Sequence, residues 1–308
     1  MGMEPFRLKP FFSERVWGKK SLAPWFASTG TEELVGEAWL TGPQSTVETG
    51  PHAGERLDAV IAAEGAAVLG EGSGEAAFPL LVKILFPADK LSVQVHPDDV
   101  QAQAIGEPRG KTECWYVLEA EPGAAVALGL KDGVTLEDVR AAIADGTLEE
   151  KLEMVPVRVG DMLFVDAGTV HAIGPGVVLL ETQQTSDRTY RMFDYGRPRE
   201  LHVEQGVRVT KLKTRAGKVA PRVMDGFTRL IEEQYFSVDH FELKDGGVAV
   251  TMDGPGCLVG LSGSAVVRSN AEEVELRKAS AVVVPAGSEV RVEALGAGVS
   301  FARCMAPR

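Results

Sequence analysis

The sequence predicts a mainly β protein made of two β-barrels, with a small helical insertion in the first barrel. Short apolar runs of strand length dominate the chain and are separated by Gly, Pro and Asp turn residues. In addition, residues 159–171 resemble residues 277–289. Both segments consist of a turn, an apolar strand, a small residue followed by Gly, and a further strand. The economical interpretation of this repeat is two copies of one barrel.

The predicted elements all fall at the lengths usual for globular proteins. Thr135 is a suitable N-cap for a helix whose apolar residues recur at i, i+3 and i+4, and Gly146 ends it. Thr147 then opens a second short helix, and we expect further helices at 57–66 and 99–104. Predicted strands cover residues 80–86, 91–96, 114–118, 124–130, 161–165 and 177–181. The domain prediction is a first domain over 1–215 with its helical insert near 132–153, a Lys- and Arg-rich linker near 210–221, and a second domain over 216–308.

Bulk composition excludes several classes of function. The 308 residues are 44% hydrophobic and 25% charged, which is typical of a globular protein. A net charge of −12 without a basic run disfavours a nucleic-acid partner. We find neither an apolar segment of membrane-spanning length nor a signal peptide. Cys114, Cys257 and Cys304 lack CxxC spacing, so we expect a reducing, cytoplasmic location and a core role for Cys114.

Four side chains on neighbouring predicted strands form a candidate metal site. Side chains alternate faces along a strand, so Gln94 and His96 point the same way. Glu113 and His171 lie on or beside other predicted strands, close enough in sequence for all four to converge at the mouth of one barrel, and the Gly-flanked turn before His171 favours its role as a ligand. Two imidazoles, a carboxylate and an amide suit Zn²⁺, although Mn²⁺, Co²⁺ or Fe²⁺ could use the same ligands. A metal with one open position indicates catalysis rather than a structural role.

Several motifs together resemble a known family. The segment Gly160 to His171 matches the pattern G-D-x-x-x-V-x-A-G-x-x-H, which resembles the second motif of the cupin superfamily, whose barrels are jelly rolls. With Gln94–Pro97 (QVHP), 110–118 (GKTECWYVL) and 189–191 (TYR), the chain resembles the type I phosphomannose isomerases of short bacterial form. The segments 15–18 (RVWG) and 36–39 (GEAW) belong to the resemblance, and the C-terminal third matches only in outline.

The resemblance implies a function and a set of site residues. The family interconverts mannose 6-phosphate and fructose 6-phosphate with zinc, and its zinc ligands fall on Gln94, His96, Glu113 and His171, which implies one ion per chain. Its active-site cations fall on Lys111 and Arg191, its acidic residues on Glu181 and Asp187, and a further cation on Arg197. Longer members have His where this chain has Gly110, so a mechanism that uses that His as the base does not apply here.

Chemistry assigns roles to these residues but leaves the base open. Aldose–ketose exchange needs a base near C1 and C2 and stabilisation of the enediolate oxygens, to which a metal contributes several kcal/mol. Glu181 and Asp187 are candidate bases, and Lys111 is another if its pKa is depressed. Arg191, Lys111 and Arg197 are candidates for binding the substrate phosphate.

Two other functions remain open at this stage. A non-catalytic cupin that binds a sugar or sugar phosphate as a sensor would also carry a metal. A metal-dependent oxygenase would require a redox metal and a more open facial site, and Gln94 as a fourth ligand disfavours it. The sequence does not predict the oligomeric state or the activity on other sugars.

Overall fold

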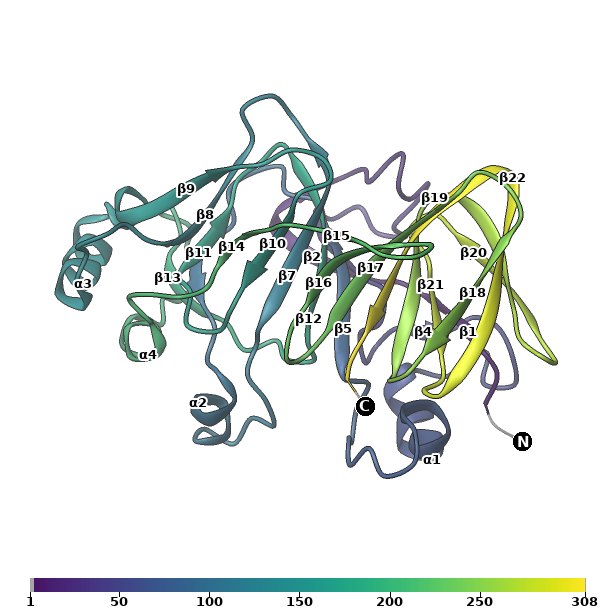
Figure 1. Ribbon diagram of the computed structural model, residues 1–308. Helices are drawn as coiled ribbons and strands as arrows, with labels where there is room; N and C mark the ends of the chain where they lie inside the picture. The colour runs from purple at the N-terminus through teal and green to yellow at the C-terminus, as the bar shows by residue number, and fades with distance from the viewer. Residues whose placement is uncertain (1–2, 308) are drawn as a thin grey trace.

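The computed structural model describes residues 3–307 and confirms a mainly β protein. Its antiparallel strands form sheets of ten, seven and five strands. The molecule consists of two halves that lie side by side, and each is built mainly of strands (Figure 1). No helix within residues 3–307 combines the length and apolar character needed to cross a membrane.

Two sheets form the first half of the molecule. The seven-stranded sheet has the order β14-β10-β7-β12-β5-β3-β2, and the five-stranded sheet has the order β13-β6-β11-β8-β9. The strands of the larger sheet are β2 (Phe11–Lys19), β3 (Val35–Trp39), β5 (Leu80–Leu85), β7 (Glu113–Ala120), β10 (Met162–Val165), β12 (Val177–Gln184) and β14 (Gly217–Val219). Those of the smaller sheet are β6 (Val93–Val95), β8 (Ala125–Leu130), β9 (Leu152–Pro156), β11 (His171–Ile173) and β13 (Tyr190–Phe193).

The ten-stranded sheet forms most of the second half. Its main path is β15-β16-β17-β22-β19-β21-β1-β4, with β18 paired to β22 and β20 paired to β19. Its strands are β1 (Phe6–Lys9), β4 (Thr46–Val47), β15 (Arg222–Val223), β16 (Thr228–Glu232), β17 (Ser237–Leu243), β18 (Gly247–Met252), β19 (Gly256–Arg268), β20 (Glu273–Arg277), β21 (Ala281–Val284) and β22 (Ser288–Met305).

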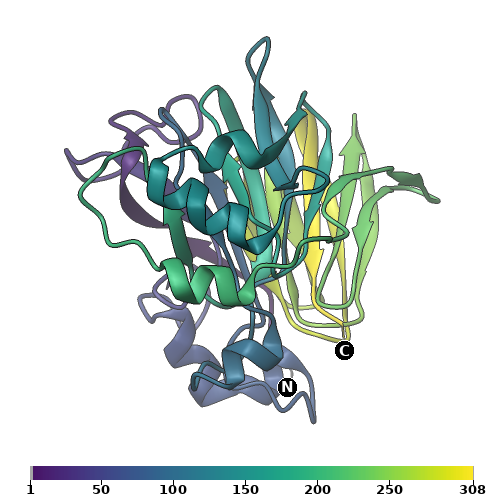
Figure 2. The same ribbon diagram turned by 90° about the vertical axis from the view of Figure 1, so that its left-hand side faces the viewer.

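The predicted helices are confirmed. Thr135 caps α3 (Leu136–Asp145) in a capping box with Asp138, and Gly146 ends it in the left-handed conformation that glycine tolerates best. The other helices are α1 (Leu57–Leu69), α2 (Asp99–Gln103), the short 3₁₀ turn η1 (Leu148–Lys151) and α4 (Val203–Val209). The sequence did not predict α4. It lies beside α3 at the outer end of the first half, which is the side that faces the viewer in Figure 2.

Strand alternation divides the core into layers. Glu113, Trp115 and Val117 point between the two first-half sheets, whereas Cys114 packs toward the second half with Cys257 and Cys304. The three thiols are buried and free, as expected for Cys114. Helices α3 and α4 cover the outer face of the five-stranded sheet, and the ten-stranded sheet curls around its own apolar core. The first-half sheets therefore enclose a separate interior.

Strand pairing crosses the predicted domain division. β1 pairs with β21 and β4 pairs with β1, so the first strand of the chain lies in the second-half sheet. Conversely, β14, which follows residue 215, pairs with β10 of the first half. The division between residues 215 and 216 and the repeat of 159–171 in 277–289 stay predictions. Within the repeat, Gly168 and Gly287 both have positive φ and both precede a strand.

Candidate active site

The inward faces of the two first-half sheets position the candidate residues. On the seven-stranded sheet, Lys83 of β5 lies directly opposite Glu181 of β12. On the five-stranded sheet, Gln94 of β6 is paired with His171 of β11 on one side and with Arg191 of β13 on the other. Because side chains two residues apart share a face, the strands carry these groups and the apolar core on the same inner surface.

His96, Glu113 and His171 form a buried cluster whose possible metal-binding atoms lie within 4.8 Å of one another. Nε2 of His96 is 3.6 Å from Glu113 Oε2, and Nε2 of His171 is 3.5 Å from Glu113 Oε1. Nδ1 of His96 donates to the Arg188 carbonyl, and Nδ1 of His171 donates to the Thr169 carbonyl. These bonds fix the tautomer that leaves both Nε2 lone pairs facing Glu113, as in protein metal sites.

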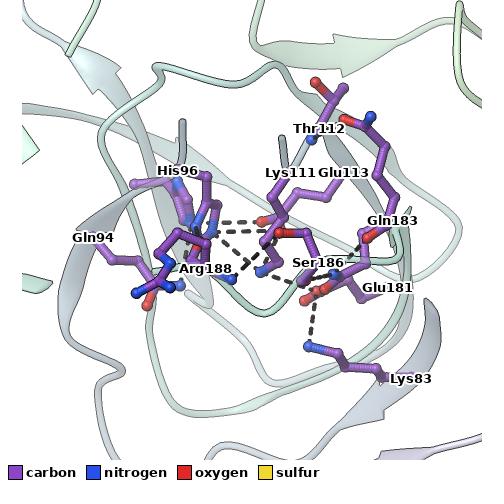
Figure 3. Close-up of polar contacts among 12 residues, drawn as sticks. Lys83, Gln94, His96, Lys111, Thr112, Glu113, Glu181, Gln183, Ser186 and Arg188 are labelled. Atoms are coloured by element: carbon purple, nitrogen blue, oxygen red, sulfur yellow. Dashed lines mark hydrogen bonds and ion pairs between the residues drawn. The ribbon is translucent and has the colours of Figure 1, made fainter. Parts of the chain in front are cut away.

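The donor set of this cluster fits a divalent metal. Among the described residues, Glu113 Oε2 has no hydrogen-bond partner although it is buried. Nζ of Lys111 forms an ion pair with this oxygen at 2.8 Å and lies 3.2 Å from His96 Nε2, so these atoms already accommodate a cation. The Gln94 amide nitrogen is 3.2 Å from His171 Nε2, and a half-turn of the amide would present Oε1 instead. His96, Glu113 and His171 therefore meet at one point, with the Gln94 amide beside His171, and Figure 3 shows Gln94, His96 and Glu113 around this site.

Burial keeps both imidazoles neutral. Desolvation lowers the pKa of His171 to about 4. Desolvation, with the nearby charges of Lys111 and His171, also lowers the pKa of His96 well below its ordinary value. A neutral imidazole is the form that binds a metal, so neither ring has to lose a proton before binding at neutral pH.

Beside this cluster, lysines and carboxylates alternate in a series of buried ion pairs. Glu181 Oε1 is 3.6 Å from both Lys111 Nζ and Lys83 Nζ, and Lys83 Nζ is 3.6 Å from Glu37 Oε2. Figure 3 shows Glu181 between the two lysines. Glu181 Oε1 lacks a hydrogen-bond partner within residues 3–307. Burial, and then the charge of Glu113, raise the pKa of Glu181, and the two lysines offset only part of this effect.

Glu37 and Lys111 in this series of ion pairs stay charged, whereas Glu181 does not have a fixed charge. Burial alone would raise the pKa of Glu37, but the charges of Lys83 and Arg15 and a hydrogen bond from Trp39 outweigh it and lower the pKa to about 2. Burial alone would lower the pKa of Lys111, but Glu113 and Glu181 outweigh it and raise that pKa. Glu37 is thus a fixed anion and Lys111 a fixed cation, whereas the raised pKa of Glu181 favours proton exchange.

A cavity of about 430 Å³ opens onto these groups. Arg191 is half-buried at its wall, and its Nε has no hydrogen-bond partner in the described part of the chain. Burial, and then the charge of Arg199, lower the pKa of Arg191. The polar side chains lining the cavity are Glu14, Arg15, Glu37, Lys83, Ser92, Gln94, Lys111, Glu181, Asp187, Thr189, Arg191 and Arg199.

The structure separates the predicted residues into two groups. Lys111, Glu181, Asp187 and Arg191 all line the cavity, with Glu181 buried and Asp187 exposed at the rim. Arg197 does not line it, because its guanidinium is bound to Asp89 (2.5 Å) and Asp194 (3.2 Å) and donates to the Lys90 carbonyl (2.8 Å). Arg199, two residues on, lines the cavity, and it too donates to Asp194, at 2.6 and 2.7 Å.

The sequence prediction missed Arg15, Glu37, Lys83 and Arg199. One signal was available for Lys83, because it is a lone charge inside the apolar run 80–86. Arg15 and Glu37 belong to segments that contribute to the family resemblance, but the resemblance assigned neither residue a role. In the structure they form an ion pair at 2.9 Å. No local pattern distinguishes Arg199 from Arg197.

Gly110 has no room for a side chain. A Cβ at this position would lie 2.5 Å from the Asp98 carbonyl carbon and 2.6 Å from the Pro97 carbonyl oxygen. The loop that carries Lys111 therefore packs directly on the backbone that follows His96. The histidine of longer family members could not be placed here without moving this backbone.

Comparisons with known proteins identify the family. The family model for the catalytic domain of type I phosphomannose isomerase matches residues 5–132. The mannose-6-phosphate isomerase of Streptococcus mutans is 36% identical over 92% of this chain and 92% of its own length. This chain belongs to the type I phosphomannose isomerase family.

Solved structures agree with this assignment. The mannose 6-phosphate isomerase of Bacillus subtilis superposes with a TM-score of 0.87 and 29% identity, covering 98% of this chain and 99% of that one. A structure described as mannose 6-phosphate isomerase bound with zinc and yttrium has a TM-score of 0.78 at 18% identity, covering 99% of this chain and 100% of that one, which shows a shared fold. The family and the cupin-like β fold predicted from the sequence are confirmed.

Proposed function

We propose that this chain interconverts mannose 6-phosphate and fructose 6-phosphate by transferring a proton between C1 and C2 through an enediolate. One observation carries the proposal. Glu181, a buried carboxylate whose Oε1 accepts no hydrogen bond from the described residues, lies between two lysines in a cavity that also holds Gln94 and Arg191. The cavity thus combines a base, fixed cations and an approach to the metal ligands, as this reaction requires.

We infer that Glu181 is the base. Its raised pKa, caused first by burial and then by the neighbouring charge of Glu113, brings it closer to neutral pH, where proton transfer in both directions is efficient. Oε1 of Glu181 accepts no hydrogen bond within residues 3–307, since its two lysine partners are 3.6 Å away, and it can therefore accept a substrate proton. Asp187 is exposed at the rim, and the raised pKa of Lys111 keeps that side chain protonated, so both fit the role less well.

The lysines and arginines have separate proposed tasks. Protonated Lys111 and Lys83 stabilise negative charge that develops on the sugar oxygens beside Glu181. Arg191, whose Nε is unpaired, and Arg199 bind the phosphate, for which the planar guanidinium is well suited. Binding the phosphate away from the reacting carbons positions C1 and C2 against the base. Arg197, which the sequence also predicted to bind phosphate, keeps a structural role in this proposal.

The proposed metal is one Zn²⁺ per chain, held by Gln94, His96, Glu113 and His171. When bound, a divalent ion supplies a Lewis acid that polarises the carbonyl and hydroxyl oxygens of the substrate. The neutral imidazoles support this ligand set, as does Glu113 Oε2, which accepts no hydrogen bond from the described residues and faces a cation, Lys111. The apolar core behind the cluster, including Trp115, limits water around the reacting groups.

Turnover of two sugars tests the proposal. The zinc-loaded chain is incubated with mannose 6-phosphate and, separately, with mannose, and ketose formation is followed. We expect fructose 6-phosphate from the phosphosugar and little turnover of the free sugar. Removal of the metal with a chelator should abolish the rate, and added zinc should restore it. Binding of mannose 6-phosphate without turnover would instead support the non-catalytic sugar-binding cupin.

A further inference from the structure

Three backbone N–H groups of the loop that carries Lys111 donate hydrogen bonds that hold the loop in place. The Gly110 N–H donates to Asp99 Oδ1 (2.8 Å), the Lys111 N–H to the Pro97 carbonyl (3.0 Å) and the Thr112 N–H to Gln184 Oε1 (2.9 Å). Each acceptor lies within three residues of a site residue, since Pro97 and Asp99 follow His96 and Gln184 follows Glu181. The loop position is therefore set by the same segments that carry the site.

Asp99 joins these segments at one point. Its Oδ1 accepts from both Gly110 N–H and Gln184 Nε2 (2.9 Å), so one carboxylate oxygen fixes the loop and the end of β12 together. The absence of a side chain at Gly110 lets the loop approach the Asp99 backbone directly, at 2.7 Å for a Cβ built there. A small rotation of Asp99 would therefore move the backbone on either side of Lys111.

The other oxygen of Asp99 is held by the second half of the molecule. Tyr235 lies in the loop between β16 and β17, and its hydroxyl donates to Asp99 Oδ2 at 2.7 Å. The adjacent Phe236 is buried in the core shared by the two halves, which fixes the backbone that carries Tyr235. The second half thus reaches the Lys111 loop through the Tyr235 hydroxyl, although its strands bear none of the predicted site residues.

We propose that Tyr235 is a positioning residue for catalysis: its hydroxyl orients Asp99, and Asp99 fixes the Gly110–Thr112 backbone so that Lys111 points into the cavity. This inference rests on the proposed isomerase function. Lys111 touches both Glu113 and Glu181, so an error in its position affects the proton transfer more than it affects phosphate binding, which Arg191 and Arg199 provide from β13 and the loop after it.

Single substitutions separate this role from simple stabilisation. Tyr235→Phe keeps the ring and removes only the hydroxyl, and we expect kcat to fall about five- to tenfold while KM for mannose 6-phosphate changes less than about twofold. Asp99→Ala should lower kcat about 100-fold, because it releases the loop as well. Asp99→Asn should restore most of that loss, since its amide oxygen still accepts from Gly110. Tyr116→Phe, a half-buried tyrosine facing His240, is the matched control and should leave kcat unchanged.

A double substitution provides the decisive readout. If the hydroxyl acts only through Asp99, Tyr235→Phe should have no further effect on kcat in the Asp99→Ala background. If Asp99→Ala does not fold, the Tyr235→Phe and Asp99→Asn results decide the matter. If the wild type is active and Tyr235→Phe has an unchanged kcat, even with a lower melting temperature, the positioning role is overturned and the proposed function is not. An inactive wild type overturns the proposed function, and this inference with it.

Discussion

Buried charges occur in both halves of the molecule, but they are paired differently. In the first half, Lys83, Lys111, Glu113 and Glu181 lie close together with ion pairs of 2.8–3.6 Å. In the second half, Asp239 is fully buried between Arg229 and Arg303. This difference cannot be predicted from the sequences of the two regions, because each has charged residues within apolar strands.

The second-half cluster satisfies its charges. Asp239 Oδ2 accepts from Arg303 Nε (3.0 Å) and Nη2 (2.6 Å), and Oδ1 is bound to Arg229 Nε. Arg303 also donates to the Thr251 carbonyl, and its guanidinium lies over Phe227 and Phe241. In the first half, by contrast, Glu113 Oε2, Glu181 Oε1 and Arg191 Nε are buried and make no hydrogen bond within the described part of the chain, although the two carboxylates form ion pairs with lysines.

The comparison distinguishes a charge that stabilises the fold from one that acts on a ligand. An unpaired buried polar atom costs free energy, so a fold retains it where something else binds. The predicted repeat shows the same contrast. His171 faces the interior of the first half, whereas Glu289 at the matching position is exposed.

The largest loss of activity should follow from removing a metal ligand. We expect His171→Ala to lose the metal and to lower kcat/KM by more than about 1,000-fold, because a Lewis acid supplies several kcal/mol. Metal content and turnover are measured on the same sample. His240→Ala, a half-buried histidine bonded to Ser300, is the control and should keep both. Stoichiometric zinc in the His171 variant would remove it from the ligand set.

A loss almost as large should follow from Glu181→Gln. Removing the base should lower kcat about 10²- to 10⁴-fold while the metal is retained. A base works when deprotonated, so the wild-type rate should rise with pH as Glu181, with its raised pKa, ionises. The rate of the variant should lack this rise. An unchanged pH profile in Glu181→Gln would assign the base elsewhere, with Asp187 tested next.

A smaller effect is expected at the phosphate end of the cavity. Arg191→Ala should keep the metal and reduce kcat/KM for mannose 6-phosphate about 100-fold, equivalent to the loss of one or two charged hydrogen bonds. Arg197→Ala, whose cation is already paired with Asp89 and Asp194, should change kcat/KM less than about threefold. The reverse order of the two variants would restore Arg197 as the phosphate ligand.

The second-half cluster should affect stability and not the rate. Asp239→Ala leaves two arginines without their partner and should lower the free energy of unfolding by about 3–5 kcal/mol. Denaturant unfolding measures this loss. The kcat per folded molecule should stay at the wild-type value, and a tenfold fall in kcat would show that the two halves are more tightly coupled than the comparison implies.

The sequence predicted much of this site because of local chemistry. Alternation along strands placed Gln94, His96 and the apolar core correctly, and Thr135 and Gly146 marked the ends of α3. Pairings between distant strands were beyond such reasoning. The ion pairs of Lys83 depend on the register of β5 with β12, and the orientation of Arg197 depends on Asp89, 108 residues away in the sequence. The placement of β1 in the second-half sheet is equally nonlocal.

The central claim is that one divalent ion binds where the two first-half sheets meet. Anomalous X-ray diffraction at the zinc absorption edge, on crystals of the zinc-loaded chain, locates that ion directly. We predict one anomalous peak per chain, about 2.0–2.2 Å from Nε2 of His96, Nε2 of His171 and a carboxylate oxygen of Glu113, with Gln94 Oε1 turned toward it. A fully loaded crystal with its peak elsewhere, or with none near these atoms, would contradict the account.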